Sequence, residues 1–268
     1  MNNPAKHRKP RLKKIQFEIH LTDHCNLNCQ MCDHFSPLAE EYYLDLQDFQ
    51  KQMERLSFLF HKEAQFIRLL GGEPLLHPDV VSFFPITRAC FPETDIKLYT
   101  NGLLLPAQTD AFWEACTKYN IIIVITKYPV KFDYDKLQKT LEEKKIPFYY
   151  ENPEPIKSSW HFPLDLNGTQ NETISFKLCQ MAGKCIFLKD NILYPCTVPG
   201  NIVHFNRYFG TGIPLSEQDG INIFETDSAD EILDFLCTPI PFCKYCDTIH
   251  RREGLEWKRT QKDIKEWT

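Results

Sequence analysis

The chain has 268 residues, a formal net charge of −5, 43% hydrophobic residues and 25% charged residues, as expected for a soluble globular protein. This composition excludes a disordered chain and gives no support for nucleic-acid binding, and the longest aliphatic run, 121–125, is too short to span a bilayer. No apolar stretch follows the basic amino-terminal residues to form a signal peptide, so we expect a cytoplasmic protein.

The first fourteen residues carry the densest basic stretch of the chain. Its lysine and arginine residues are Lys6, Arg8, Lys9, Arg11, Lys13 and Lys14. We predict a solvated, flexible tail over residues 1–14, with an arm for an anionic partner as the alternative.

Eleven cysteines in a chain without an export signal favour reduced thiols or metal ligands over disulfides. Three of them, Cys25, Cys29 and Cys32, lie directly after an apolar run at 15–21 that predicts a strand. Three soft thiolates at this spacing suit a zinc ion or an iron–sulfur cluster. A structural zinc site normally has four ligands, and only His24 and His34 are close enough in sequence to substitute. A four-iron cluster on three cysteines instead leaves one iron open to a small molecule.

Strand-like and helix-like segments alternate after this loop. The expected strands are 65–70, 95–100, 121–126 and 148–151, and the expected helices are 45–60, 78–90, 106–119 and a segment beginning at 133. Asp45 and Asp133 are expected as N-caps, and a helix break is expected near Pro85. This alternation predicts parallel strands with right-handed crossovers, in a doubly wound sheet or in a full or partial barrel.

Polar motifs follow the ends of these strands. Gly71-Gly72-Glu73-Pro74 follows the second strand, Thr100-Asn101-Gly102 follows the third, and Thr126 ends the fourth. Both architectures place active sites at the carboxyl ends of parallel strands. We therefore expect the cysteine loop and these motifs to meet at one edge of the sheet.

The order of the three motifs resembles the radical S-adenosylmethionine (AdoMet) enzymes, also called radical SAM enzymes. That family has a C-x3-C-x2-C loop after its first strand, GGEP after its second and often TNG after its third, and the match spans roughly residues 15–130. The resemblance implies a partial (β/α)6 TIM-like barrel. It also implies a [4Fe–4S] cluster on Cys25, Cys29 and Cys32 that binds AdoMet, and an electron donor such as flavodoxin or ferredoxin.

The same resemblance implies contacts to AdoMet. Gly71 and Gly72 would let the backbone approach the methionyl end, and Glu73 would accept from its ammonium group; an ordinary glycine turn is the alternative. Further contacts are expected from Thr100, Asn101 and Thr126 toward the ribose or carboxylate, and from Met31 beside the adenine unless Met31 simply packs. Asp33, His34 and Ser36 could reach a substrate or serve as caps and core residues.

Cysteines return after a loose polar connector at 153–173, which holds at most a weak sixth strand. They are Cys179, Cys185, Cys196, Cys237, Cys243 and Cys246. Apolar runs at 186–188 and 192–194 predict a hairpin, with Asn191 tolerating a positive φ at the turn. The hairpin would bring Cys185 and Cys196 together, and Cys243 with Cys246 would complete a tetrathiolate site.

This spacing resembles the twitch module, a shortened SPASM domain that binds one auxiliary four-iron cluster in many radical SAM enzymes, although Asn191 stands where such hairpins often have glycine. It implies an auxiliary [4Fe–4S] cluster on Cys185, Cys196, Cys243 and Cys246, with a zinc ribbon as the alternative. Cys179 and Cys237 are left open as a replacement ligand, a hydrogen-atom donor or packing residues. Cys90 and Cys116 are expected to pack within helices. The predicted division is a barrel at 15–173 and an auxiliary-cluster region at 174–268.

Two kinds of function fit these expectations. The first is a radical SAM oxidoreductase or epimerase that abstracts hydrogen from a polyol, sugar or nucleotide sugar, most simply an oxidation in which the auxiliary cluster takes the second electron. The second is a maturase that crosslinks or epimerises a peptide or protein. Peptide maturases often carry a leader-binding domain before the barrel, and the short segment before the first strand here favours the small molecule. No nucleic-acid or membrane partner is expected. A third alternative is a non-catalytic, zinc-binding structural protein, but it would require the GGEP and TNG motifs to have arisen by chance.

Overall fold

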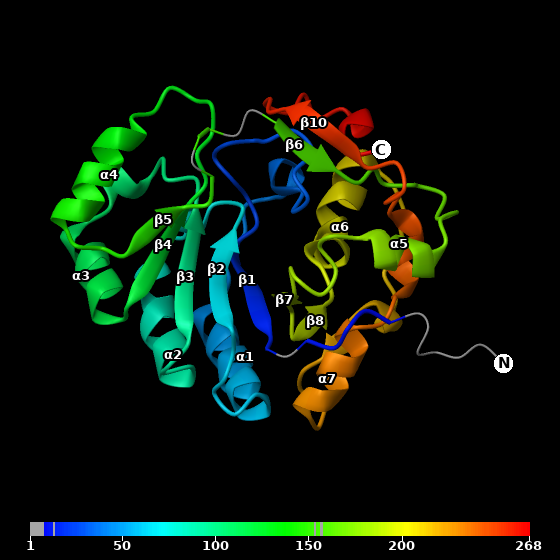
Figure 1. Cartoon of the computed structure of the whole chain (residues 1–268), viewed down its shortest axis with the longest axis horizontal. Coiled ribbons are helices and arrows are strands. Elements are labelled where there is room, and N and C mark those ends of the chain that lie inside the picture. Colours follow the sequence, from blue (N-terminus) through cyan, green and yellow to red (C-terminus); the bar gives the residue numbers. More distant parts are fainter. Residues whose placement is uncertain (1–7, 13, 153, 156–157) are drawn as a thin grey trace.

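A computed structural model describes residues 8–12, 14–152, 154–155 and 158–268 of the chain. Its centre is an eight-stranded sheet with the order β5-β4-β3-β2-β1-β7-β8-β9 (Figure 1). The pairings from β5 to β7 are parallel, and β8 and β9 add antiparallel strands at one edge. The strands are β1 (Gln16–Thr22), β2 (Phe66–Gly71), β3 (Asp95–Thr100), β4 (Ile121–Ile125), β5 (Phe148–Tyr150), β7 (Phe187–Lys189), β8 (Ile192–Tyr194) and β9 (Ile221–Asn222).

A helix joins each pair of successive strands from β1 to β5, as the alternating pattern predicted. These helices are α1 (Leu46–Leu59), α2 (Phe83–Cys90), α3 (Asp110–Lys118) and α4 (Tyr134–Glu143). Asp45 caps α1 by accepting from the N–H groups of Gln47 and Asp48, and Asp133 caps α4. The predicted mixed α/β fold with a partial barrel is thereby confirmed.

Pro85 does not break a helix as expected. It lies in the first turn of α2, where backbone N–H groups have no partner within the helix. The missing N–H of proline therefore removes no helical hydrogen bond. The residues before α2 instead form a separate 3-10 turn at Val80–Ser82.

The sixth parallel strand comes from a part of the chain where it was not expected. The polar connector forms β6 (Ser158–His161), which pairs antiparallel with β10 (Arg252–Glu256) in a separate two-stranded sheet. Strand β7 instead pairs with β1, with Ile19 opposite Leu188. The main sheet is therefore extended beyond β1 and not beyond β5.

The carboxyl-terminal region packs around the predicted hairpin. Its helices are α5 (Glu172–Leu178), α6 (Thr197–Phe209) and α7 (Ala229–Leu236). The hairpin β7–β8 turns at Asp190 and Asn191, whose φ angles are 49° and 70°. These values are the left-handed conformation that a two-residue hairpin turn requires, so the hairpin prediction is confirmed.

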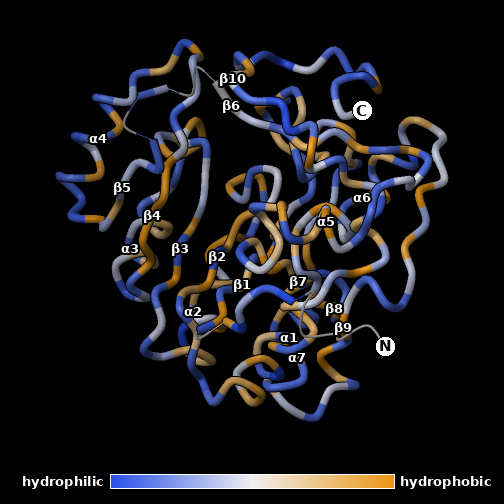
Figure 2. The backbone as a smooth tube through the Cα atoms, turned by 45° about the vertical axis from the view of Figure 1, so that its right-hand side comes forward, coloured by the Kyte–Doolittle hydropathy of each residue, from blue (hydrophilic) through white to orange (hydrophobic). Residues whose placement is uncertain are grey.

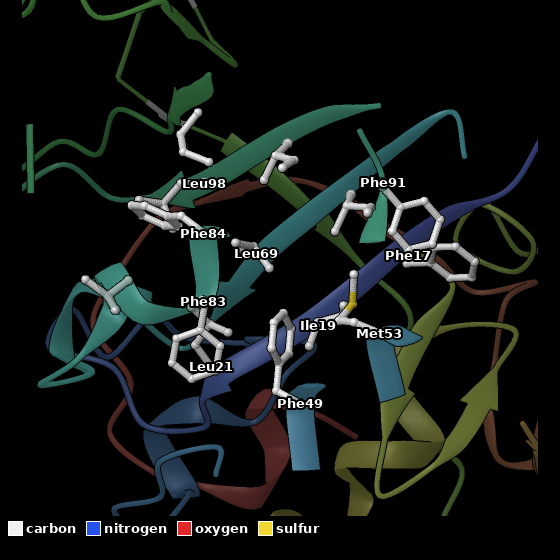
Figure 3. Close-up of a cluster of buried hydrophobic side chains, with 14 of the residues drawn as sticks. Phe17, Ile19, Leu21, Phe49, Met53, Leu69, Phe83, Phe84, Phe91 and Leu98 are labelled. Atoms are coloured by element: carbon white, nitrogen blue, oxygen red, sulfur yellow. The ribbon is translucent and has the colours of Figure 1, made fainter. Parts of the chain in front are cut away.

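Alternation along β1 separates a hydrophobic face from a polar one. Phe17, Ile19 and Leu21 are at most 1% exposed and pack with residues of α1 and α2 (Figure 3). The Phe17 ring meets the Phe60 ring edge-on at 5.3 Å. Hydrophobic segments concentrate on the central strands in Figure 2. Because successive side chains on a strand point to opposite faces, the intervening residues point into the barrel.

The predicted flexible tail differs from the structure where it is described. The Lys9 ammonium donates to the carbonyl oxygens of Cys179 and Ala182 at 2.6 and 2.9 Å. Arg11 forms an ion pair with Asp230 of α7. Residues 8–12 are therefore held against the carboxyl-terminal region, while Lys6 and Lys13 of the predicted tail, and Pro153 of the connector, lie outside the described residues.

None of the helices in the described residues has both the length and the apolar composition that a membrane span needs.

Candidate active site

The carboxyl ends of the parallel strands enclose a cavity of about 530 Å³. It is lined by nearly every residue predicted at this edge, namely Cys25, Cys29, Met31, Cys32, Asp33, His34, Ser36, Gly71, Gly72, Thr100, Asn101 and Thr126. Glu73 lies behind this lining and is completely buried. The structure thus brings the cysteine loop and both motifs together.

The two glycines allow β2 to end tightly against the strand that leads into the cysteine loop. A Cβ atom on Gly71 would lie 2.1 Å from the carbonyl oxygen of Thr22, and one on Gly72 would lie 2.1 Å from that of His24. Gly71 also has a φ of 148°, which side chains rarely adopt. Glycine is therefore required at both positions for the loop to be held where it is.

The cysteine loop is covered by the last residues of the chain. Residues 28–30 pair with 258–260 through backbone hydrogen bonds, and Cys29 forms an antiparallel bridge with Arg259. The Trp257 indole N–H donates to the Cys29 sulfur at 3.2 Å, and the Trp267 indole N–H donates to the Cys32 carbonyl at 3.1 Å. The segment after Cys246, which has no cysteine, thus fixes the loop, and the sequence analysis missed this role.

The Glu73 carboxylate accepts three hydrogen bonds from within the protein. Its carboxylate accepts from the Thr100 hydroxyl at 2.7 Å, the Asn101 N–H at 2.9 Å and the Leu75 N–H at 3.2 Å. Burial raises the pKa of Glu73 to about 7, although these hydrogen bonds favour the ionised form. In this structure Glu73 therefore holds the TNG turn, and its contact with an AdoMet ammonium group stays a prediction.

Further side-chain contacts connect the motifs to one another. The Asn101 amide donates to the side-chain oxygen of Asn26 at 2.8 Å, which ties the TNG turn to the cysteine loop. The Thr126 hydroxyl donates to the Glu151 carboxylate at 3.0 Å. Met31 lines the cavity with a φ of 56°. These contacts hold the edge of the barrel as one unit.

The three loop thiols suit a soft metal centre. Burial raises the pKa of Cys32 to about 12 and also raises the pKa values of Cys25 and Cys29. Binding of a soft metal removes the thiol proton, and N–H donors to sulfur stabilise the thiolate. The Leu27 N–H donates to the Cys25 sulfur at 3.4 Å, and Trp257 serves Cys29 in the same way. This donor set fits an iron–sulfur cluster.

A second group of thiols lies in the carboxyl-terminal region. Cys196 is within electrostatic range of the thiols of Cys179, Cys243 and Cys246, and Cys243 and Cys246 are each within range of Cys179. Cys185 instead lines the cavity, where its charged neighbours are Glu18, Arg68 and Asp33. Cys179 therefore lies near three of the predicted ligands, and Cys185 packs against the same hydrophobic cluster as these four cysteines. The ligand set of an auxiliary cluster stays a prediction.

The remaining cysteines lie in packed surroundings. Cys90 and Cys116 are at most 9% exposed and belong to the main hydrophobic core. Cys237 is 3% exposed, and its thiol approaches the Pro10 carbonyl at 3.6 Å. All eleven cysteines lie in the described part of the chain, and none of them forms a disulfide bond there.

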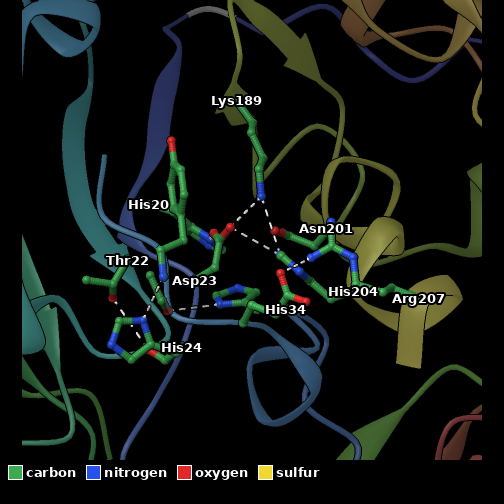
Figure 4. Close-up of polar contacts among 12 residues, drawn as sticks. His20, Thr22, Asp23, His24, His34, Lys189, Asn201, His204 and Arg207 are labelled. Carbon is green, nitrogen blue, oxygen red and sulfur yellow. Dashed lines mark hydrogen bonds and ion pairs between the residues drawn. The ribbon is translucent and has the colours of Figure 1, made fainter. Parts of the chain in front are cut away.

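A buried polar network links the cysteine loop to the hairpin and α6 (Figure 4). Asp23 at the end of β1 is 3% exposed, and it accepts from the Lys189 ammonium at 2.7 Å. Nitrogen atoms of His20 and His204 lie 3.3 and 3.2 Å from the same carboxylate. Burial opposes ionisation of Asp23, but the histidine contacts and the Lys189 charge outweigh it and hold its pKa below the usual range.

The His20 ring gives this network a pH dependence. Burial lowers its pKa, because desolvation and the charges of Lys189 and His204 disfavour the imidazolium more than Asp23 stabilises it. The His34 ring lies tilted against the His20 ring, with 4.6 Å between the centroids. The unfolded ring binds a proton near pH 6.5, so the stability that His20 contributes is complete above about pH 6.5 and is lost as the pH falls.

We therefore expect a His20→Gln variant to be less stable than the wild type at about pH 7.5, with a smaller difference at about pH 5.5. The difference should shrink by at most about 1.4 kcal/mol per pH unit, because one proton is involved. Urea unfolding at both pH values measures it. An unchanged difference would show that His20 has the same pKa in the folded and unfolded states.

Comparison with known protein families gives a match to the part of the chain that carries this site. The Radical SAM superfamily model matches residues 19–125, which include the cysteine loop and both motifs. Residues 19–125 thus have the sequence of a radical SAM domain. Among solved structures, the chain is similar to BtrN in complex with AdoMet and 2-DOIA, with a TM-score of 0.50, 16% identity, and coverage of 88% of this chain and 94% of BtrN. At that identity the likeness concerns the fold alone.

Curated relatives match a smaller part of the chain. GTP 3',8-cyclase of Peptoclostridium acidaminophilum is 31% identical over 128 residues, which are 46% of this chain and 39% of that protein. The corresponding enzyme of Trichodesmium erythraeum is 41% identical over 105 residues, or 36% of this chain and 30% of that protein. The chain thus spans well under half the length of these relatives.

Proposed function

We propose that this radical SAM enzyme cleaves AdoMet reductively, abstracts a hydrogen atom from a polyol, sugar or nucleotide sugar, and oxidises it. The cavity carries the proposal, because the cysteine loop, both motifs and side chains of the barrel interior all line it. A reactive radical and its target must share one space from which water is excluded, and a cavity of about 530 Å³ lies within the usual range for small-molecule sites.

In this proposal Cys25, Cys29 and Cys32 hold a [4Fe–4S] cluster. When bound, that cluster supplies an electron to AdoMet, whose C–S bond then breaks to give the 5′-deoxyadenosyl radical. The protein's own part is positioning. Gly71 and Gly72 let β2 end close against the backbone that leads into the cysteine loop, and Glu73 holds Thr100, Asn101 and the turn that they form.

Cys179, Cys196, Cys243 and Cys246 are the proposed ligands of an auxiliary [4Fe–4S] cluster, with Cys179 in the place first predicted for Cys185. A cluster there supplies an acceptor for one electron. In the oxidation, one hydrogen atom leaves the substrate carbon for the 5′-deoxyadenosyl radical, which becomes 5′-deoxyadenosine. The substrate radical would then lose one electron to this acceptor and its hydroxyl proton to a carboxylate of the cavity lining, which includes Glu18, Asp33 and Glu151. The product is a carbonyl compound about two mass units lighter.

A nucleotide substrate is the second candidate, because the matched relatives are GTP 3',8-cyclases. It would share the AdoMet chemistry and differ in what occupies the rest of the cavity. The following experiment separates the two candidates.

Reconstituted enzyme is incubated anaerobically with AdoMet, a reductant and either neutral polyols and sugars or GTP, in deuterated water. We expect one equivalent of 5′-deoxyadenosine per carbonyl product from a polyol or sugar, with a mass loss of about two units. An isomer of unchanged connectivity that carries one solvent deuterium would contradict oxidation and indicate epimerisation. Loss of that deuterium in a Cys185→Ala variant would identify the donor thiol, since Cys185 lines the cavity. Turnover of GTP alone would favour the second candidate.

A further inference from the structure

Charged side chains alternate with hydrophobic ones on the first two strands and point into the barrel. On β1, Glu18 lies between Phe17 and Ile19, both of which are buried against the helices. On β2, Arg68 lies between Ile67 and Leu69, which belong to the same hydrophobic core. Side chains that alternate with core residues must point to the opposite face of the sheet. Both residues line the cavity, as this alternation requires.

Glu18 and Arg68 form an ion pair across the two strands. They are register partners in the parallel pairing of β1 with β2, and an Arg68 terminal nitrogen donates to a Glu18 carboxylate oxygen. Their side chains are 3% and 20% exposed. The guanidinium group lies over the rings of Phe66 and Tyr99 at 5.0 and 5.1 Å. The pair is therefore fixed in orientation from several sides.

The pair keeps unused hydrogen-bonding capacity. Within the described part of the chain, the buried Nε of Arg68 has no hydrogen-bond partner. A guanidinium has five N–H donors and a carboxylate has about four acceptor sites, so one bond between them leaves donors and acceptors available. A buried donor without a partner is costly, and a ligand in the cavity would remove that cost.

The charge of the cavity argues against a highly anionic ligand. Among the described residues that line it, Arg68 is the only lysine or arginine, and Glu18, Asp33 and Glu151 are carboxylates. Glu18 already neutralises Arg68. A triphosphate would meet no free cationic side chain there, whereas a neutral hydroxylated molecule would meet both donors and acceptors.

We propose that Glu18 and Arg68 bind two neighbouring hydroxyl groups of a neutral polyol or sugar, an inference that rests on the proposed function. One hydroxyl donates to the carboxylate, and the oxygen of the next accepts from the guanidinium. A planar guanidinium beside a carboxylate presents donors and acceptors at adjacent positions, which matches the spacing of hydroxyl groups on neighbouring carbons. The pair would thus select an uncharged, polyhydroxylated substrate at the floor of the cavity.

The test uses reconstituted enzyme with AdoMet and measures binding of radiolabelled myo-inositol, glucose and GTP by equilibrium dialysis. The double variant Glu18→Gln, Arg68→Gln removes both charges without leaving one unpaired. We expect it to bind the better of the two neutral probes at least about tenfold more weakly than the wild type. The matched control Glu40→Gln, Arg207→Gln removes an ion pair whose side chains are 71% and 54% exposed, and we expect unchanged binding.

A second variant distinguishes a specific loss of binding from a loss of binding through misfolding. Arg68→Lys keeps the charge opposite Glu18 but loses the planar fork, so we expect weaker binding of the neutral probe with unchanged iron content. Wild-type binding of both variants would overturn this inference and leave the proposed function standing if polyol turnover is seen. Preference of the wild type for GTP would overturn both. Failure of the wild type to bind any of the three probes would also contradict the inference.

Discussion

Replacement of Cys25, Cys29 and Cys32 together by alanine should lower the iron content of anaerobically reconstituted protein from about eight to about four atoms per chain, because one of the two proposed four-iron clusters would lose its ligands. Cleavage of AdoMet should fall to background. The reason is that the three thiols are the soft donors at the end of the cavity where Gly71 and Gly72 approach the loop. Iron analysis and chromatography of 5′-deoxyadenosine measure the two effects.

The matched control replaces two cysteines that lie in the hydrophobic core, Cys90 and Cys116. A Cys90→Ala, Cys116→Ala variant should keep all of its iron and its AdoMet cleavage, with some loss of stability from the removed sulfur atoms. If the triple variant keeps its full iron content, or if zinc is found in place of iron, the assignment of the loop is wrong.

Single replacements of Cys179 and Cys185 should affect the second cluster very differently. Cys179→Ala should reduce the iron content to about half, because Cys179 lies within range of Cys196, Cys243 and Cys246. The variant should still form 5′-deoxyadenosine, but substrate oxidation should disappear for lack of an electron acceptor. Cys185→Ala should keep its iron, since that thiol lies beside Glu18 in the cavity.

The double variant Cys243→Ala, Cys246→Ala provides the reference for complete loss of this site. Cys179→Ala should match it in iron content and in the spectrum of the remaining cluster. The opposite result, with iron lost in Cys185→Ala and kept in Cys179→Ala, would restore the ligand set that the hairpin spacing first suggested. Normal substrate turnover by the double variant would mean that the second group of thiols has a structural role.

The sequence predicted those parts of the fold that depend on local pattern. Helices capped by Asp45 and Asp133, the hairpin turn at Asp190-Asn191 and the order of strands β1 to β5 all follow from short stretches of sequence. The meeting of the cysteine loop with the motifs was also predictable, because the carboxyl ends of parallel strands share one edge.

Features that depend on contacts between distant segments were not predictable in the same way. The pairing of β7 with β1 joins residues far apart in the chain, and the sequence of neither strand identifies its partner strand. The choice between Cys179 and Cys185 likewise depends on where the chain turns after α5. Glu18 and Arg68 did carry a signal, because each interrupts an otherwise apolar strand, but the run at 15–21 was interpreted only as hydrophobic.

The Asp23 network has a consequence for how the chain folds. Asp23 directly follows β1, before the cysteine loop, but Lys189 and His204, which surround its carboxylate, belong to the carboxyl-terminal region. A fragment ending near residue 173 would lose both of these partners, and with them the contacts that fix the Asp23 carboxylate. It would also leave β1 as an unprotected edge strand. The barrel and the cysteine-rich region are therefore expected to fold together as one cooperative unit. The amino-terminal part is not expected to be stable when it is produced alone.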